Sequence, residues 1–188
     1  RHFGPFARSD LPEFGAGVAA GFFPFVRLRG PAAIIGLSSA VPRPPFVAAG
    51  YLGHAQLQAL SAILEHPEVA ARVPVVLVHH PPVDSRNRLL RLRDGLADAA
   101  PLRRVLARLS RGLVLFGHLH VRVRCRFGAL EVVCASGAAL DHPDDLVRAG
   151  YNLYELDDRG VVGMEAKVVD EADGSLRRTD IPTRADCV

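Results

Sequence analysis

The sequence predicts an α/β protein, and three observations support this class. Short apolar runs typical of buried strands recur along the first two thirds of the 188 residues. Segments with leucines at helical spacing lie between these runs. The last third alternates apolar and polar residues, which is typical of antiparallel hairpins. We therefore expect one α/β domain, with either one mixed sheet or two sheets facing each other between helices.

The first two thirds read as strand, helix, strand, helix, strand. Each predicted strand is an apolar run bounded by turn signals, and each predicted helix carries one apolar stripe. The buried strands are expected at 32–37, 73–78 and 113–116. The helices are expected at 54–64 and around the apolar stripe of 102–109, with Pro101 in the first turn of the second helix. This order predicts a sheet whose central strands are parallel.

The last third is predicted to form hairpins followed by a tail. Its strands are expected at 121–127, 130–134, 151–156 and 161–168. Asp157 and Gly160 supply the turn between the last two strands. We expect residues 1–170 to belong to one domain and residues 171–188 to form a polar tail.

The composition excludes two classes of protein. Apolar residues make up 49% and charged residues 23% of the chain, so it is not wholly disordered. No apolar run approaches the roughly 20 residues needed to span a bilayer. The formal net charge is +3, and the arginines are scattered, so no clear nucleic-acid patch is indicated. The oligomeric state is left open.

The cysteines and the start of the chain suggest a cytoplasmic protein. Cys125, Cys134 and Cys187 have no metal-binding spacing and make no disulfide framework, so we expect reduced thiols. The residues that follow Arg1 show no charged leader with an apolar stretch and a cleavage site, so no signal peptide is indicated.

Histidines follow two of the predicted buried strands. His79 follows the apolar run 75–78, and His118 and His120 follow the run 113–116. Ligands of open α/β sheets bind at the carboxyl ends of the strands. Continued alternation would point His118 and His120 the same way, about 6–7 Å apart. This pattern predicts two ligands of one metal, or one ligand for each of two adjacent metals, since neutral imidazole binds transition metals.

The other histidines have weaker functional signals. His80 is expected either to contact substrate or to fill space beside Pro81. The remaining four have no partner at a metal-like spacing and are expected at the surface or as caps: His2, His54, His66 and His142. The alternative interpretation, for these histidines and for those at the strand ends, is that they are ordinary loop residues without a functional role.

Two motifs resemble those of a known family. Residues 75–82, Val-Val-Leu-Val-His-His-Pro-Pro, resemble the fourth signature of the calcineurin-like metallophosphoesterases. Residues 113–120 resemble the fifth, which contains Gly-His-x-His. Residues 35–40 and 56–60 resemble the family's central strand and the helix after it. Residues 150–156 resemble a late strand of its bacterial, cyclic-nucleotide-phosphodiesterase-like members, so the resemblance covers roughly 30–165.

The resemblance implies a fold, a reaction and a set of metal ligands. The fold would be two mixed sheets packed face to face with helices outside. The reaction would be hydrolysis of a phosphoester by a hydroxide held between two divalent metals, which are Mn, Fe, Zn or Co. His79 and His118 would bind the second metal, and His120 the first. The substrate would be a small phosphoester whose identity the sequence does not specify.

The chain departs from the family at its first three signatures. Asp-x-His, Gly-Asp-x-x-Asp and Gly-Asn-His-Asp/Glu are not in this sequence, although in the family they supply the carboxylate that bridges the metals. Asp84 and Asp141 are expected to serve turns or helix caps instead. The chain therefore resembles the C-terminal part of such an enzyme. We expect little or no activity from it alone, with a bare sheet edge where strands are lacking.

Two other interpretations remain. The chain could be a non-catalytic remnant of the fold that binds a metal or a partner. A zinc hydrolase of the lactamase type is disfavoured, because Val121 and Arg122 stand where that class has an Asp-His pair. Four arginines in the loop after the 73–78 strand could meet a phosphate, although a solvated loop is the plainer expectation: Arg86, Arg88, Arg91 and Arg93.

Overall fold

The larger sheet is mixed, with a parallel centre. The computed structural model describes residues 8–14, 23–82, 93–170 and 172–185. Within them, the strands of this sheet lie in the order β1-β2-β3-β4-β6-β5. Their bounds are β1 Phe25–Arg29, β2 Ala32–Gly36, β3 Val73–Leu77, β4 Leu113–Phe116, β5 Val123–Phe127 and β6 Leu130–Cys134. Strands β2, β3, β4 and β6 pair in parallel, and β1 and β5 close the edges in antiparallel pairs.

Helices make the crossovers that parallel strands require. Helices α1 (His54–Glu65) and α2 (Pro67–Ala70) lie between β2 and β3, and α4 (Ala99–Leu106) lies between β3 and β4. A short 3-10 turn, η1 (Pro12–Phe14), precedes β1. The predicted buried strands and the helix at 54–64 are confirmed. The second helix runs from Ala99 to Leu106, so Pro101 lies in its first turn as expected, and the helix ends three residues before Leu109.

The smaller sheet is antiparallel. It contains β7 (Gly150–Asp157), β8 (Gly160–Val169) and β9 (Leu176–Thr179), in that order. Asp157 Oδ1 accepts the backbone N–H groups of Arg159 (2.8 Å) and Gly160 (3.1 Å), which closes the predicted β7–β8 hairpin. The resemblance implied that this sheet would also be mixed. The described strands are not, because a tight turn joins β7 to β8 and forces them antiparallel.

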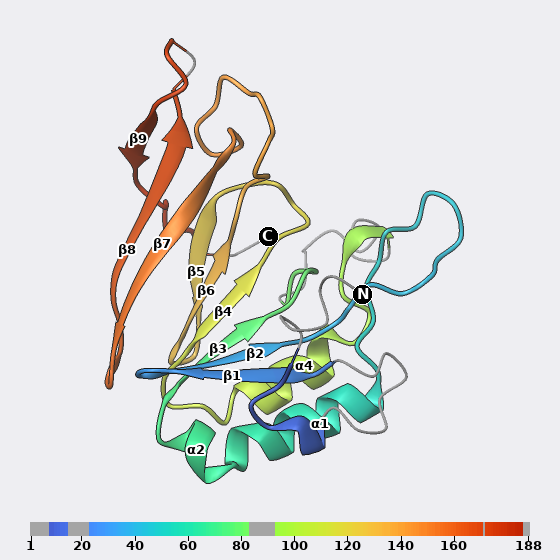
Figure 1. Cartoon of the computed structure of the whole chain (residues 1–188). Helices are drawn as coiled ribbons and strands as arrows, with labels where there is room; N and C mark the ends of the chain where they lie inside the picture. The colour runs from blue at the N-terminus through green and yellow to red at the C-terminus, as the bar shows by residue number, and fades with distance from the viewer. Residues whose placement is uncertain (1–7, 15–22, 83–92, 171, 186–188) are drawn as a thin grey trace.

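The two faces of the larger sheet are covered by different layers (Figure 1). Val76 and Val114 point to the face on which α1 and α4 pack. Val75 and Leu113 point to the opposite face, where Ala166 of β8 joins them in a second core. The described part of the chain is therefore layered helix–sheet–sheet. The expected outer helices on the far side of the smaller sheet are not among the described residues.

Part of the segment expected to be a polar tail belongs to the fold. Strand β9 pairs with β8, and the side chain of Ile181 is only 5% exposed in the second core. The backbone N–H of Arg184 donates to the carbonyl of Arg124, which ties the segment to β5. The polar composition of this segment did not indicate a strand, because an edge strand pairs through its backbone and needs few buried side chains.

The cysteines differ from the expectation of reduced thiols. Cys134 is a free, buried thiol, as expected. Cys125 takes part in a disulfide, so the expectation is wrong for that residue. Cys187 lies outside the described residues. Pairing between cysteines leaves no spacing motif in the sequence, which is why sequence reasoning did not find the bond.

The helices were also compared with the requirements for crossing a bilayer. Among the described residues, no helix combines the necessary length with the necessary apolar character.

Candidate metal centre

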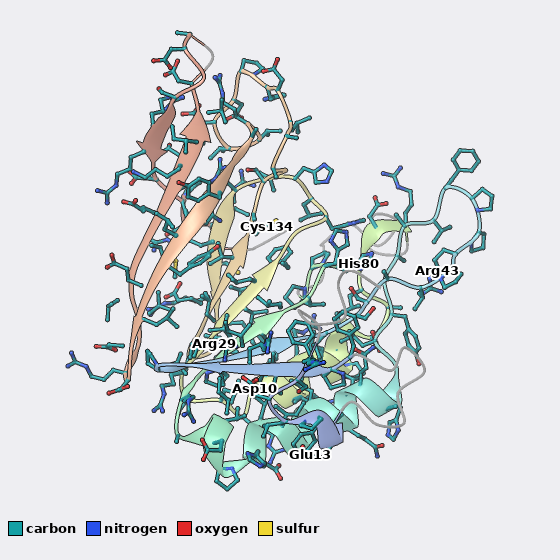
Figure 2. The ribbon with its side chains drawn as sticks, in the orientation of Figure 1. Asp10, Glu13, Arg29, Arg43, His80 and Cys134 are labelled. Atoms are coloured by element: carbon teal, nitrogen blue, oxygen red, sulfur yellow. The ribbon has the colours of Figure 1, made fainter. Side chains whose placement is uncertain are left out.

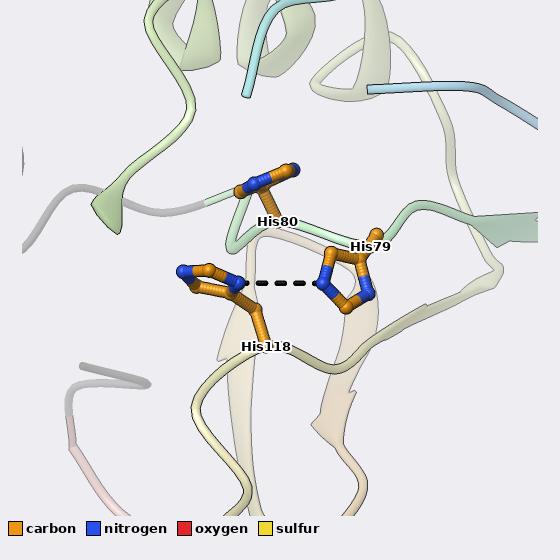
Figure 3. A group of neighbouring side chains, drawn as sticks. All are labelled: His79, His80 and His118. Atoms are coloured by element: carbon orange, nitrogen blue, oxygen red, sulfur yellow. Dashed lines mark hydrogen bonds between the residues drawn. The ribbon is translucent and has the colours of Figure 1, made fainter. Parts of the chain in front are cut away.

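The candidate site lies where β3 and β4 end side by side. The two strands are parallel neighbours, so their carboxyl ends meet at the same edge of the sheet. His79 and His80 come shortly after β3, and His118 shortly after β4. Beyond the strands, the backbone N–H of Gly117 donates to the carbonyl of His79 at 3.0 Å. The three imidazole rings therefore meet in one cluster (Figure 3).

His79 and His118 have the spacing of two ligands of one ion. His118 Nδ1 lies 3.3 Å from His79 Nε2, and the two rings are nearly perpendicular, at 82°. A tetrahedral zinc ion with Zn–N bonds of about 2.0–2.1 Å holds two ligand nitrogens about 3.3–3.4 Å apart. The observed separation fits that value. His79 is exposed, so the pair is accessible from solvent.

The backbone at His118 is held in an uncommon conformation. His118 has a φ of 65°, and the N–H of Leu119 donates to the carbonyl of Gly117 at 2.7 Å. A three-residue hydrogen-bonded turn with positive φ at its centre is the rarer and more strained form of the γ-turn. Strained backbone of this kind clusters at functional sites.

His120 does not join the cluster. The sequence predicted that His118 and His120 would alternate along an extended chain and point the same way. That prediction is wrong, because φ is 65° at His118 and 52° at His120, and neither value is extended. His120 is exposed and lies outside the group whose ring nitrogens are close enough to share an ion. Its role as a metal ligand stays a prediction from the resemblance.

His80 is buried, with both ring nitrogens engaged by the protein. Its Nε2 lies 2.7 Å from the carbonyl oxygen of Ala48, and its Nδ1 lies 2.8 Å from Ser39 Oγ. A carbonyl only accepts, so Nε2 carries the proton and Nδ1 accepts from the Ser39 hydroxyl. Burial is the main cause that lowers the pKa of His80, which favours this neutral form. A metal bound to His80 would have to displace one of these hydrogen bonds.

His80 packs against the rings of His79 and His118 and helps to hold them in place. Its ring centroid lies 4.6 Å from that of His118 and 5.0 Å from that of His79. Its exposed fraction is 5%. Contact with substrate stays a prediction, since the structure shows the ring covered and its polar atoms paired.

The surroundings of His118 lower its pKa. Burial lowers the pKa of His118 first, and the neighbouring His79 and His120 lower it further. Asp94 acts in the opposite direction. Because neutral imidazole is the form that binds metals, a lowered pKa favours binding at neutral pH.

Asp94 is the carboxylate that sequence reasoning missed. Its negative charge partly opposes the lowering of the His118 pKa, so Asp94 lies close enough to the cluster to influence it. Arg93 holds it through two nitrogens, each 2.9 Å from Asp94 Oδ2. Its position at the end of an arginine-rich loop did not indicate a functional carboxylate. Asp141, which the sequence analysis considered, is exposed.

The other histidines behave as expected where they are described. The ring nitrogens of His66 and His142 accept backbone N–H groups two residues further on, as caps do. His54 is exposed at the start of α1. Several residues considered from sequence lie outside the described ranges: His2, Asp84, Arg86, Arg88 and Arg91.

An open apolar hollow adjoins His79. It has a volume of about 350 Å³ and faces the ends of β2, β3 and β4. His79 and Gly117 form its border with the histidine cluster. The apolar side chains around it include Phe23, Phe25, Leu37, Leu77, Leu115 and Phe116. A ligand at the histidines would therefore have apolar protein surface beside it.

The chain was compared with known proteins. No protein-family model matches it, and neither does any curated protein sequence.

Proposed function

We propose that this chain carries the histidine part of the metal centre of a phosphoester hydrolase. The observation that supports this most is the 3.3 Å separation of His79 Nε2 and His118 Nδ1 at the ends of neighbouring parallel strands. These two histidines stand in the His-His-Pro-Pro and Gly-His-x-His motifs that resemble the calcineurin-like metallophosphoesterases. The same resemblance suggests that the two packed sheets correspond to that family's sandwich.

In this proposal each described residue has a defined task. His79 and His118 would hold a divalent ion, which supplies charge neutralisation for the phosphate and a hydroxide at neutral pH. His80 keeps the other two rings in place through Ser39 and Ala48. The apolar hollow beside His79 would receive a non-polar part of the substrate.

The lack of a carboxylate in the histidine group limits the activity that the chain can have alone. Among the described residues, the group whose ligand atoms lie close together contains three histidines and no Asp or Glu. Two divalent ions at about 3.5–4 Å repel each other strongly without an anionic bridge. We therefore propose that two metals are bound only when further carboxylates are supplied, and that the isolated chain binds one metal and hydrolyses little.

The alternative is a non-catalytic remnant that binds one metal or a partner. The observation that favours it is the same lack of a carboxylate in the histidine group. The two candidates differ in what the metal leaves open to phosphate. A hydrolase centre keeps coordination positions that bind the phosphate product, whereas in a remnant the partner or further protein ligands would fill those positions.

The test measures orthophosphate binding to the zinc-loaded and manganese-loaded chain by isothermal titration calorimetry. For the hydrolase we expect phosphate binding that requires metal and is lost in His118→Ala. His142→Ala, which alters a half-buried histidine outside the close group, is the matched control and should bind as the parent does. Metal uptake without phosphate binding would favour the remnant. Cleavage of a chromogenic phosphodiester, by the chain alone and with any coding sequence that precedes Arg1, then tests catalysis.

A further inference from the structure

The loop between β2 and α1 presents apolar side chains to solvent. It projects from the body of the protein (Figure 1). Phe46 is 95% exposed, and Val47 (37%) and Tyr51 (45%) are exposed beside it in the sequence. Figure 2 labels Arg43 on this loop and His80 between the loop and the ends of the strands. Here we call residues 41–49 the Phe46 loop.

Phe46 occupies a backbone position that suits glycine. The N–H of Val47 donates to the carbonyl of Pro44 at 3.2 Å, with Pro45 and Phe46 at the centre of the turn. Phe46 has a φ of 68°. Proline followed by a residue of positive φ is the pattern of a type II turn, in which glycine or asparagine is favoured at the second central position. A bulky residue there is a genuine conformational outlier.

The fold gains little from Phe46. Its backbone is strained, and its side chain is almost wholly in water, so neither its conformation nor its burial stabilises the protein. Apolar surface left in water forgoes the gain of roughly 25 cal/mol per Å² that burial would give. A residue that combines a strained backbone with an exposed apolar side chain is better explained by a contact with a molecule outside this chain.

The base of the loop is fixed, so the tip is presented in a defined place. Arg43 Nε donates to the carbonyl of Ala49 at 2.9 Å, and the N–H of Ala48 donates to the carbonyl of Arg93 at 2.8 Å. The carbonyl of Ala48 accepts from His80 Nε2 at 2.7 Å. The loop that carries Phe46 is therefore hydrogen-bonded to the histidine cluster itself.

Size and charge together indicate the partner. The exposed apolar side chains here are Phe46, Val47 and Tyr51, whereas each side of a stable protein–protein interface buries roughly 800 Å² from about 20–30 residues. Exposed aromatic and apolar side chains can insert shallowly into the headgroup region of a bilayer, and attraction between basic residues and anionic lipids adds to that binding. Residues 30–64 contain Arg43 and no Asp or Glu, so the loop carries positive charge only. That charge suits an anionic surface.

We propose that the Phe46 loop attaches the protein to anionic lipid surfaces, with Phe46 inserted among the headgroups and Arg43 close to them. This attachment does not depend on the proposed hydrolase activity. It would place the histidine cluster beside the membrane.

The experiment is co-sedimentation of the protein with vesicles of phosphatidylcholine that contain about 30% phosphatidylglycerol, compared with phosphatidylcholine alone. We expect binding to the anionic vesicles that weakens at high salt. Phe46→Ser should reduce the partition coefficient about tenfold, because it removes most of the inserted apolar area. Phe46→Gly should do the same while fitting the observed φ, which separates lost binding from a disturbed turn.

Val162→Ser is the control, because it also removes an exposed apolar side chain (60%), here from β8, which is not part of the loop. It should leave vesicle binding unchanged. The proposal is overturned if the parent protein does not bind the anionic vesicles, or if the Phe46 variants bind as well as the parent. It is also overturned if sedimentation velocity shows that Phe46→Ser converts a dimer to a monomer, since the tip then contacts a second copy. None of these readouts requires hydrolysis.

Discussion

A Cβ atom on Gly50 would stand 2.3 Å from Nδ1 of His80. This is closer than side-chain contacts in proteins allow, so the imidazole occupies its place only because residue 50 has no side chain. Gly50 is itself fixed, since its N–H donates to the carbonyl of Gly95 and its carbonyl accepts from Ala97. The space for His80 is therefore set by Gly50 and by the segment 95–97 that holds it.

The first prediction is that Gly50→Ala displaces His80. The added methyl group must push the ring away from Ser39, which overpacks a buried position and should lower the free energy of unfolding by about 1–3 kcal/mol. Urea denaturation measures this change. Gly137→Ala is the control, because a Cβ there meets only Leu140, at an ordinary 3.5 Å. Equal stability of the two variants would contradict the prediction.

The second prediction is that replacing His118 weakens zinc binding and replacing His120 does not. Removing a ligand of the close pair, by His79→Ala or His118→Ala, should weaken zinc binding at least tenfold, since only one ring nitrogen of the pair remains. His120→Ala should bind zinc nearly as the parent does, because His120 lies outside the close group. Isothermal titration calorimetry checks both results. An equal loss in His120→Ala would instead favour the ligand set that the family resemblance implies.

The third prediction concerns the Cys134 thiol. Burial raises the pKa of Cys134 to about 11, and its Sγ donates to the carbonyl of Gly117 at 3.4 Å. The thiolate is the reactive form, so native Cys134 should react with iodoacetamide at pH 8.5 far more slowly than the unfolded chain does. Peptide mass mapping measures the rate at this residue.

The sign of the pH effect follows from the same shift. The thiol pKa is higher in the folded state than in the unfolded state, so its contribution to stability is complete below about pH 8.5 and declines as the pH rises towards 11. Cys134→Ala should remove that part of the pH dependence. Rapid native alkylation, or an unchanged alkaline profile in the variant, would show that the thiol is not protected.

The sequence was a good guide to the elements and a poorer guide to the loops that form the site. Buried strands and helices were predictable because apolar periodicity reflects burial directly. His79 and His118 were placed at one edge because parallel strands share their direction. The position of His120 was not predictable, since it depends on positive φ at two non-glycine residues. The hydrogen bonds of His80 and the charge of Asp94 come from loops packed in three dimensions, and such contacts leave no local pattern.

The last prediction concerns Arg122, which the sequence offered only as an argument against a lactamase-type site. Its side chain is fully buried, with an exposed fraction of 0%. Its Nε donates to Asn152 Oδ1 of β7 at 3.1 Å, and one terminal nitrogen donates to Ser136 Oγ at 2.6 Å. Further bonds reach the carbonyls of Asp145 and Arg148. One guanidinium thus joins the start of β5, the loop after β6 and the smaller sheet.

Replacing Arg122 by Met should therefore be strongly destabilising. Methionine preserves apolar bulk but leaves several buried acceptors without a donor, each of which costs about 1–3 kcal/mol, so a loss of about 3 kcal/mol or more is expected. Thermal and urea unfolding measure this loss. Arg159→Met is the control, since that side chain is 91% exposed and its ion pair with Asp157 is screened by solvent, so its loss should change stability little. A small effect at Arg122 would mean that water replaces the guanidinium, and that the two sheets are held together by their apolar core alone.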